Sequence, residues 1–303
     1  MTMMRTDPQA PRENKLHGDS MFPLAEYVYT ANPGEQAIDC HWHEEAEFVY
    51  VLKGQTLFQI GTRYFPVKAG EAVFVHSGDI HAGHPYGDSG CEFFAVVFHM
   101  DWLQSMAHDR VQNDYLSPLL AGKRSLPQLY DGKELWSASI LDNLNAIRRV
   151  LESKLPGYEL AVKARIYLIL AEIAGSQRWV QRRRGKEVER NQTEALKKVL
   201  SYIEANYRDK IYIKQLAEMT HMSESQFCRF FKRLVRKTPV EYMNGYRIRR
   251  AAALLREGDR KMLDIAMEVG FDNPSYFIKR FREELRCTPA EYRKLHLQGE
   301  AQD

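Results

Sequence analysis

The sequence predicts a two-domain α+β protein: an N-terminal β-barrel with flanking helices, followed by an all-α C-terminal domain. At 303 residues the chain is long enough for two separate hydrophobic cores. Residues 21–100 consist of short apolar runs broken by Gly, Pro and Asp, which is typical of strands, whereas residues 101–180 have helical periodicity. The C-terminal third contains two similar segments offset by about 50 residues.

We expect four parts along the chain. Residues 1–20 form a polar tail, residues 21–180 the barrel domain, residues 181–193 a charged, non-periodic linker, and residues 194–296 the all-α domain. The barrel strands are predicted from apolar runs at 47–52, 56–60, 72–75 and 92–98.

Two helices are expected after the strands. One has an apolar stripe formed by Ile140, Leu144, Ile147 and Leu151, and the other, over residues 160–179, is apolar on more of its circumference. Such helices either cover the barrel or form the contact between two copies of the chain, and the sequence leaves both interpretations open.

The sequence pattern of each copy of the C-terminal repeat predicts a helix-turn-helix. Ser223 is suited to cap the second helix of copy one, and Asn273 followed by Pro274 that of copy two. Gly270 supplies a turn that favours positive φ. Seven residues recur at a spacing of 50, each pair being identical: Ser225/Ser275, Phe227/Phe277, Phe231/Phe281, Thr238/Thr288, Pro239/Pro289, Glu241/Glu291 and Tyr242/Tyr292.

On a helical wheel, the second helix of each copy separates phenylalanines from small polar and cationic residues. A helix needs this arrangement to pack on its own domain while it faces the major groove of DNA. Ordinary solvated basic faces would look similar, but two copies in register favour DNA. We expect base contacts from Ser225, Gln226, Arg229, Ser275, Tyr276 and Lys279. The expected phosphate contacts are Lys232 and Arg282.

The charge distribution agrees with a polyanionic partner. Residues 186–303 contain 24 Lys and Arg against 18 Asp and Glu, a net charge of +6, whereas the remaining residues contain 19 against 22, a net charge of −3. Because Gln226 and Arg229 are better suited to direct base readout than Tyr276 and Lys279, we expect the first unit to carry more of the sequence discrimination and the second more of the anchoring.

Residues from about 194 to 294 resemble the DNA-binding domain of the AraC/XylS family of bacterial transcription regulators. The resemblance rests on 265–282 and 288–293 of the second unit and on a joining helix at 240–256. Cys287 departs from the family, which usually has Gly before the Ser/Thr-Pro pair. The resemblance implies a sequence-specific regulator, more often an activator than a repressor, with promoter DNA, RNA polymerase and a second copy of the chain as partners.

A cluster of His and Glu is expected at the barrel mouth. His41, His43 and Glu47 are all odd-numbered, so an extended strand places them on one face, and His81 joins them from a neighbouring strand. With Gly54, Gly70 and Gly78, these residues resemble the two motifs of the cupin barrel found in the sensor domains of many such regulators. His76 and Pro85 depart from that pattern, which has Pro and Asn there.

Three imidazoles and a carboxylate are a possible set of ligands for a divalent transition metal. The preferred alternative is that they hydrogen-bond a polar ligand or one another, because sensor cupins often keep His-x-His without a metal. We therefore expect no metal and no other cofactor. Trp42, Tyr50 and Tyr86 could stack on a sugar ring, although such aromatics are more often part of the core.

The favoured function is a DNA-binding regulator, not an enzyme, that responds to a small molecule such as a sugar. The alternatives are a metal-dependent enzyme or metal sensor fused to a DNA-binding domain, and a regulator whose barrel only dimerises. The four cysteines have no paired spacing, no apolar run is long enough to cross a membrane, and the first 18 residues have no apolar signal core. We therefore expect a cytoplasmic protein without membrane contact.

Overall fold

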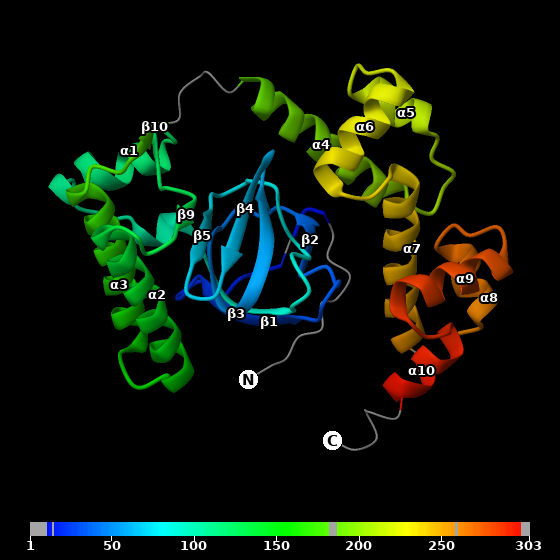
Figure 1. Ribbon diagram of the computed structural model, residues 1–303, viewed down its shortest axis with the longest axis horizontal. Coiled ribbons are helices and arrows are strands. Elements are labelled where there is room, and N and C mark those ends of the chain that lie inside the picture. The colour runs from blue at the N-terminus through cyan, green and yellow to red at the C-terminus, as the bar shows by residue number, and fades with distance from the viewer. Residues whose placement is uncertain (1–10, 14, 182–186, 258–259, 298–303) are drawn as a thin grey trace. The chain divides into compact units, whose positions relative to one another are not determined.

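The computed structural model describes residues 11–13, 15–181, 187–257 and 260–297. It divides into two compact units, Arg12–Arg190 and Asn191–Asp303, each with its own hydrophobic core. The first unit is rich in strands and the second is helical (Figure 1). The predicted fold class, with two helix-turn-helix units in the C-terminal part, is confirmed.

The first unit is built around one long strand, β3 (Ala46–Ile60). The N-terminal part of β3 pairs with β7 and β5, and its C-terminal part pairs with β4 and β6, so β3 belongs to both halves of the sheet. All these pairs are antiparallel, as are β1 with β7 and β2 with β6. The other strands of this sheet are β1 (Leu24–Ala31), β2 (Ile38–His41), β4 (Arg63–Lys68), β5 (Ala72–Val75), β6 (His81–His84), β7 (Cys91–Phe98) and β9 (Leu129–Tyr130).

Side chains alternate along β3 between two cores. Val49 and Val51 belong to the core enclosed by the strands, together with Phe58 and Phe93. Phe48 belongs to a second core shared with the helices. This alternation follows from the two-residue period of an extended strand, which sends successive side chains to opposite faces.

Helices cover the outer face of the sheet. The stripe predicted at Ile140, Leu144, Ile147 and Leu151 is buried on α2 (Leu135–Ser153), which packs against α3 (Tyr158–Gly175). The remaining short elements are the 3₁₀ helix η1 (Met100–Leu103), the π-helix η2 (Val111–Leu116), α1 (Ser117–Leu120), and the paired strands β8 (Arg124–Ser125) and β10 (Val180–Gln181).

The second unit consists of seven helices among the described residues. They are α4 (Glu187–Asn206), α5 (Ile213–Met219), α6 (Glu224–Val235), α7 (Pro239–Arg256), α8 (Met262–Glu268), α9 (Pro274–Leu285) and α10 (Pro289–Leu297). The first helix-turn-helix is α5–α6, the second is α8–α9, and α7 is the expected joining helix.

The repeated Thr-Pro-x-Glu segment is a helix start. Thr238 accepts a hydrogen bond from the Glu241 backbone, and the Glu241 carboxylate accepts one from the Thr238 backbone at 2.7 Å. Thr288 and Glu291 repeat this reciprocal pair. Such a capping box satisfies backbone donors that an α-helix leaves unpaired at its N-terminus. Ser223 and Asn273 cap α6 and α9 as predicted.

The turns of the two units use different residues at the same position. Gly270 has φ +90°, and a Cβ there would lie 2.6 Å from the Arg208 carbonyl oxygen, so only glycine fits. His221 occupies the equivalent place with φ 54°. The substitution at Cys287 does not disturb its turn, because the left-handed residue there is Arg286, with φ 59°.

Two predicted boundaries differ from the structure. Helix α4 begins at Glu187, inside the predicted linker at 181–193, of which residues 182–186 lie outside the described residues. Part of the predicted polar tail is packed, since His17 is buried. Among the described helices, none combines the length and apolarity needed to span a membrane.

Candidate DNA interface and effector sites

The polar faces of α6 and α9 are exposed, and their phenylalanines are buried. The four predicted contact residues of each helix lie on the exposed side: Ser225, Gln226, Arg229 and Lys232 on α6, and Ser275, Tyr276, Lys279 and Arg282 on α9. Phe227, Phe231, Phe277 and Phe281 are fully buried. A groove along α9 is lined by Ser275, Ile278, Lys279, Arg282, Glu283, Arg286 and Thr288. Both helices therefore present cationic surfaces suited to a DNA duplex.

Two of the predicted base contacts also have structural roles. The Gln226 side-chain oxygen accepts hydrogen bonds from the Ser223 backbone and hydroxyl, at 3.1 and 3.0 Å, and so closes the α6 capping box. The Tyr276 hydroxyl accepts a hydrogen bond from Asn244 on α7 at 3.0 Å. Arg229 is exposed on α6, so it is the best-placed candidate for guanine readout in the first unit.

An ionic contact joins the two helix-turn-helix units. Glu284 on α9 accepts hydrogen bonds from Lys237, which precedes α7, and from Arg249 on α7, both at 3.4 Å. Gly245 leaves room for this carboxylate, because a Cβ there would lie 3.1 Å from it. The contact ties α9 to the connecting helix and helps to hold the two recognition helices at a defined spacing.

In the first unit, the predicted His and Glu residues do lie together, but not on one strand as predicted. His41 ends β2, His43 lies in the connection that follows, and Glu47 is on β3. His41 on β2 and His81 on β6 are register partners, with ring centroids 4.1 Å apart. The nitrogens that His41, His43 and His81 present to one another lie within 4.8 Å. Glu47 Oε2 is 3.1 Å from His81 Nε2 and 3.6 Å from His43 Nε2. All four residues are buried, and His81 is completely so.

The backbone sets the orientation of all three imidazoles. Each Nδ1 faces a carbonyl oxygen of a residue two positions away, at 2.8, 3.1 and 2.9 Å for His41, His43 and His81. Because a carbonyl only accepts, the proton of a neutral ring lies on Nδ1, and Nε2 presents a lone pair. Metal-binding histidines are held in the same way.

The electrostatics of the cluster favour an ionised Glu47 carboxylate. Burial opposes the charging of His43, but contact with Glu47 raises the pKa of this ring. Burial opposes ionisation of Glu47, but contacts with His43 and His81 hold its pKa well below the usual range. Burial lowers the pKa of His41 far below that of a free imidazole, and His81 and His43 add to this shift. Nevertheless, no described residue forms a well-aligned hydrogen bond with Glu47 Oε2 or His81 Nε2.

Two cluster residues were missed by the sequence analysis because they lie in the predicted tail. Glu13 Oε2 is 3.4 Å from His41 Nε2 and 3.9 Å from His17 Nε2. His17 Nδ1 lies 2.9 Å from the Tyr27 hydroxyl. Burial raises the pKa of Glu13 and lowers that of His17 to about 4. A segment without hydrophobic periodicity has no sequence pattern that predicts which strand it contacts.

The aromatic candidates do not gather around the cluster as a group. Tyr50 packs against the core shared by the sheet and the helices, whereas Glu47 lies on the opposite face of β3. Trp42 is buried, and its backbone carbonyl accepts a hydrogen bond from Glu13. Tyr86 is 39% exposed. Tyr50 therefore faces away from the His and Glu cluster and is part of the core.

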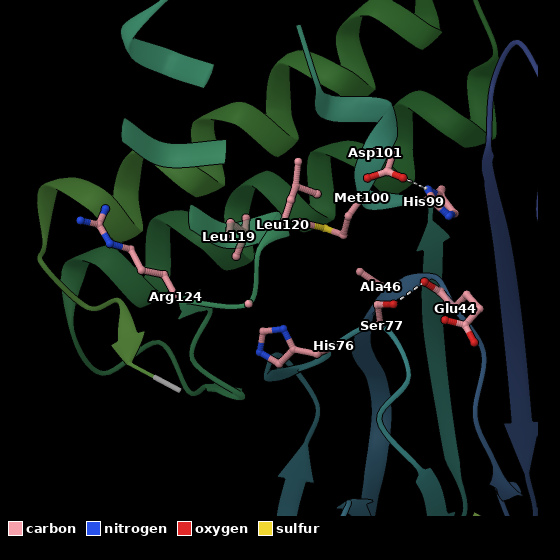
Figure 2. Close-up of a pocket in the computed structure, with 11 residues that line it drawn as sticks. Glu44, Ala46, His76, Ser77, His99, Met100, Asp101, Leu119, Leu120 and Arg124 are labelled. Carbon is pink, nitrogen blue, oxygen red and sulfur yellow. Dashed lines mark hydrogen bonds and ion pairs between the residues drawn. The ribbon is translucent and has the colours of Figure 1, made fainter. Parts of the chain in front are cut away.

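A cavity of about 310 Å³ lies elsewhere in this unit. Figure 2 shows His76 and Ser77 on one side of it and Met100, Leu119 and Leu120 on the other. Its lining is completed by Glu44, Ala46, His99, Asp101, Gly122 and Arg124. Polar groups thus surround an apolar patch, and His76 is the residue that departs from the cupin pattern.

Comparison with known proteins identifies both units. Residues 23–170 match the model of the AraC-like ligand binding domain, and residues 216–295 match that of a helix-turn-helix domain. The chain belongs to the AraC family. It is an AraC-type DNA-binding transcription regulator with an N-terminal ligand-binding domain.

Two relatives that match most of this AraC-family chain are named transcription regulators. An uncharacterised HTH-type transcriptional regulator, YdeC of Bacillus subtilis, is 29% identical, with 94% of this chain and 96% of the relative covered. The HTH-type transcriptional activator RhaS of Salmonella paratyphi B is 24% identical, with coverages of 92% and 96%. The solved DNA-binding domain of AdpA in complex with a target DNA is 26% identical, with a TM-score of 0.34, and covers 36% of this chain and 98% of that domain.

We predict that Arg229→Ala weakens binding of the regulator to its cognate DNA by about 1–3 kcal/mol and relaxes base preference at one position, because a bidentate contact to guanine is lost. Electrophoretic mobility shifts on cognate DNA and on a set of single-base variants would measure this.

Lys232→Ala should instead weaken binding to all sequences alike, as expected for a phosphate contact. The matched control on the same helix is Arg233→Ala, because the Arg233 side chain donates a hydrogen bond to Gln192 on α4. Equal losses on cognate and scrambled DNA for Arg229→Ala would contradict the assigned role.

Proposed function

We propose that this regulator binds promoter DNA through α6 and α9, contacts RNA polymerase and responds to a small polar effector such as a sugar. The exposed cationic faces of the two recognition helices support the first part. The relative named a transcriptional activator supports activation and a regulatory function without catalysis. A cytoplasmic location follows from the proposed DNA partner.

The cavity beside His76 is the best-supported place for the effector. Its volume of about 310 Å³ is near the lower end of the range for small-molecule sites, which is about 300–1,000 Å³. Glu44 and Asp101 can accept hydrogen bonds from hydroxyl groups, and Met100 and Leu120 offer apolar contact. The cluster around His81, by contrast, is so deeply buried that a sugar would have to displace core side chains.

We predict that Leu120→Trp, which fills this cavity, abolishes stabilisation by the effector. A panel of monosaccharides and sugar acids would be screened by thermal unfolding of the full chain. A ligand at 100 times its Kd stabilises the folded state by about 2.7 kcal/mol, which is readily detected. Leu135→Trp is the control, since Leu135 is 91% exposed on α2. Equal stabilisation of both variants would place the effector outside the cavity.

We also propose that α3 forms the contact between two copies of the chain. Val162, Ile166, Ile169 and Ile173 bury one side of α3 in its own unit. A second stripe, spaced by three or four residues, stays exposed and consists of Leu160, Ala164, Leu168, Ala171 and Gly175. A helix that is apolar on two sides needs a second partner to cover its exposed side. The small residues on that side allow the partner to approach α3 closely.

Leu168→Glu should therefore convert dimers to monomers. A carboxylate in an apolar contact costs several kcal/mol, so we expect the dimer dissociation constant to rise by about 100-fold or more. Sedimentation equilibrium would measure the change, with Leu135→Glu as an exposed-leucine control. A dimer of unchanged strength in Leu168→Glu would exclude this face.

The cluster itself supports a second candidate function, the sensing of a divalent transition metal. Nitrogens of His41, His43 and His81 lie within 4.8 Å of one another, and no described residue gives His81 Nε2 or Glu47 Oε2 a well-aligned hydrogen bond. Ligand atoms around an ion with bonds of about 2.1 Å lie about 3–4 Å apart, which is close to the spacing here. His41, His43 and His81 would hold the ion, which would place positive charge beside the buried Glu47 carboxylate.

We predict that the regulator, purified without a histidine tag, binds one transition-metal ion per chain, and that His81→Ala does not. Elemental analysis after dialysis against Zn²⁺ would measure this, and His99→Ala, outside the cluster, should behave as the wild type. Metal-free wild-type protein after this treatment would rule out metal sensing and leave effector sensing in place.

A further inference from the structure

Both recognition helices end at an arginine in the left-handed backbone conformation. Arg236 follows α6 with φ 62°, and Arg286 follows α9 with φ 59°. Each backbone N–H donates at 3.0 Å to the carbonyl four residues earlier, that of Lys232 or Arg282. Glycine adopts positive φ without a clash, whereas a residue with a Cβ loses free energy there. The turn would form more readily with glycine, so the two arginine side chains need a reason of their own.

The Arg286 side chain shares a groove with two of the predicted DNA contacts. It lines the groove along α9 together with Lys279 and Arg282. These three residues are spaced by three and four positions, so they continue one face of the helix. Glu283, an acid of the same groove, pairs with Arg280 at 2.7 Å. The groove therefore keeps a net positive charge that extends past the end of α9.

Arg236 occupies the equivalent place in the first unit. It lies 50 residues before Arg286 and has nearly the same backbone angle. On α6, Arg229, Lys232 and Arg236 have the same spacing as the three cations of α9, and all three are exposed. Each recognition helix thus presents a cation one residue beyond its C-terminal end.

The helix macrodipole alone does not account for these arginines. A cation near the C-terminus of a helix is favourable, but the last turns of α6 and α9 already contain basic residues: Lys232 and Arg233 in α6, and Arg282 in α9. A further cation in a strained conformation adds little to this effect. A guanidinium is, however, well suited to a phosphate group, because it donates two parallel hydrogen bonds to it.

We infer that Arg236 and Arg286 are a matched pair of phosphate contacts, which hold the C-terminal ends of α6 and α9 on the DNA backbone without reading its sequence. This inference rests on the proposed binding of DNA through α6 and α9. It adds one backbone contact in each unit to those expected from Lys232 and Arg282.

The test replaces each arginine by glycine in the full-length chain. Glycine accepts the left-handed conformation, so Arg236→Gly and Arg286→Gly should melt at least as high as the wild type in scanning calorimetry. Fluorescence anisotropy would measure binding to a mixed-sequence DNA duplex over a range of NaCl concentrations. The slope of log K against log[NaCl] should become shallower by about 0.9 in each variant and by about 1.8 in the double variant. Arg286→Lys, which keeps the charge, should retain the wild-type slope.

Lys154 provides a matched control in the ligand-binding unit. It is an exposed cation at the C-terminal end of α2, with φ 44°, and its ammonium group pairs with Glu26 at 3.3 Å. Lys154→Gly therefore removes the same charge from the same backbone conformation, but away from the recognition helices. We expect its slope to equal that of the wild type.

The outcomes separate this inference from the proposed function. If Lys232→Ala and Arg282→Ala give a shallower slope but the two glycine variants do not, the role of Arg236 and Arg286 is wrong and binding through α6 and α9 stands. If none of the four variants changes the slope, both proposals are wrong. A lower melting temperature with an unchanged slope would assign the arginines to helix stability and also contradict the inference.

Discussion

The architecture of the ligand-binding unit depends on the backbone pairing of β3. This 15-residue strand pairs with β4, β5, β6 and β7, so four other strands take their register from it. Because side chains alternate along it, the same strand sends Glu47 to the histidines and Phe48 to the helices. A shift of one residue would exchange these two sets and destroy both.

The DNA-binding unit depends instead on a local structural pattern that occurs twice in the chain. Each recognition helix starts at a polar cap and buries two phenylalanines one turn apart, and the next helix starts at a Thr-Pro-x-Glu capping box. The cap fixes where the helix begins, and the buried rings fix its rotation, so the cationic residues face outward. The Glu284 contact with Lys237 and Arg249 then links the two copies.

Two polar regions of the ligand-binding unit have different physical characters. The cluster around His81 is buried and short of hydrogen bonds, which suits a small cation that can satisfy lone pairs directly. The cavity beside His76 is larger and lined by both carboxylates and apolar side chains, which suits an organic molecule. Glu44 lines the cavity and follows His43 directly, so the two regions adjoin along the chain.

The sequence by itself determined the features that repeat with a local period. The amphipathic faces of α6 and α9, the caps at Ser223 and Asn273 and the stripe on α2 all follow from spacing within one element, and the fold class follows from them. Only the tertiary structure decided what depends on contacts between distant segments. Glu13 joins His41 because the N-terminal segment pairs with Trp42, and the cavity exists because the segments 44–46, 76–77, 99–101 and 119–124 come together. Side-chain periodicity encodes which face a residue occupies, whereas the partner of that face is set by long-range packing that no local pattern records.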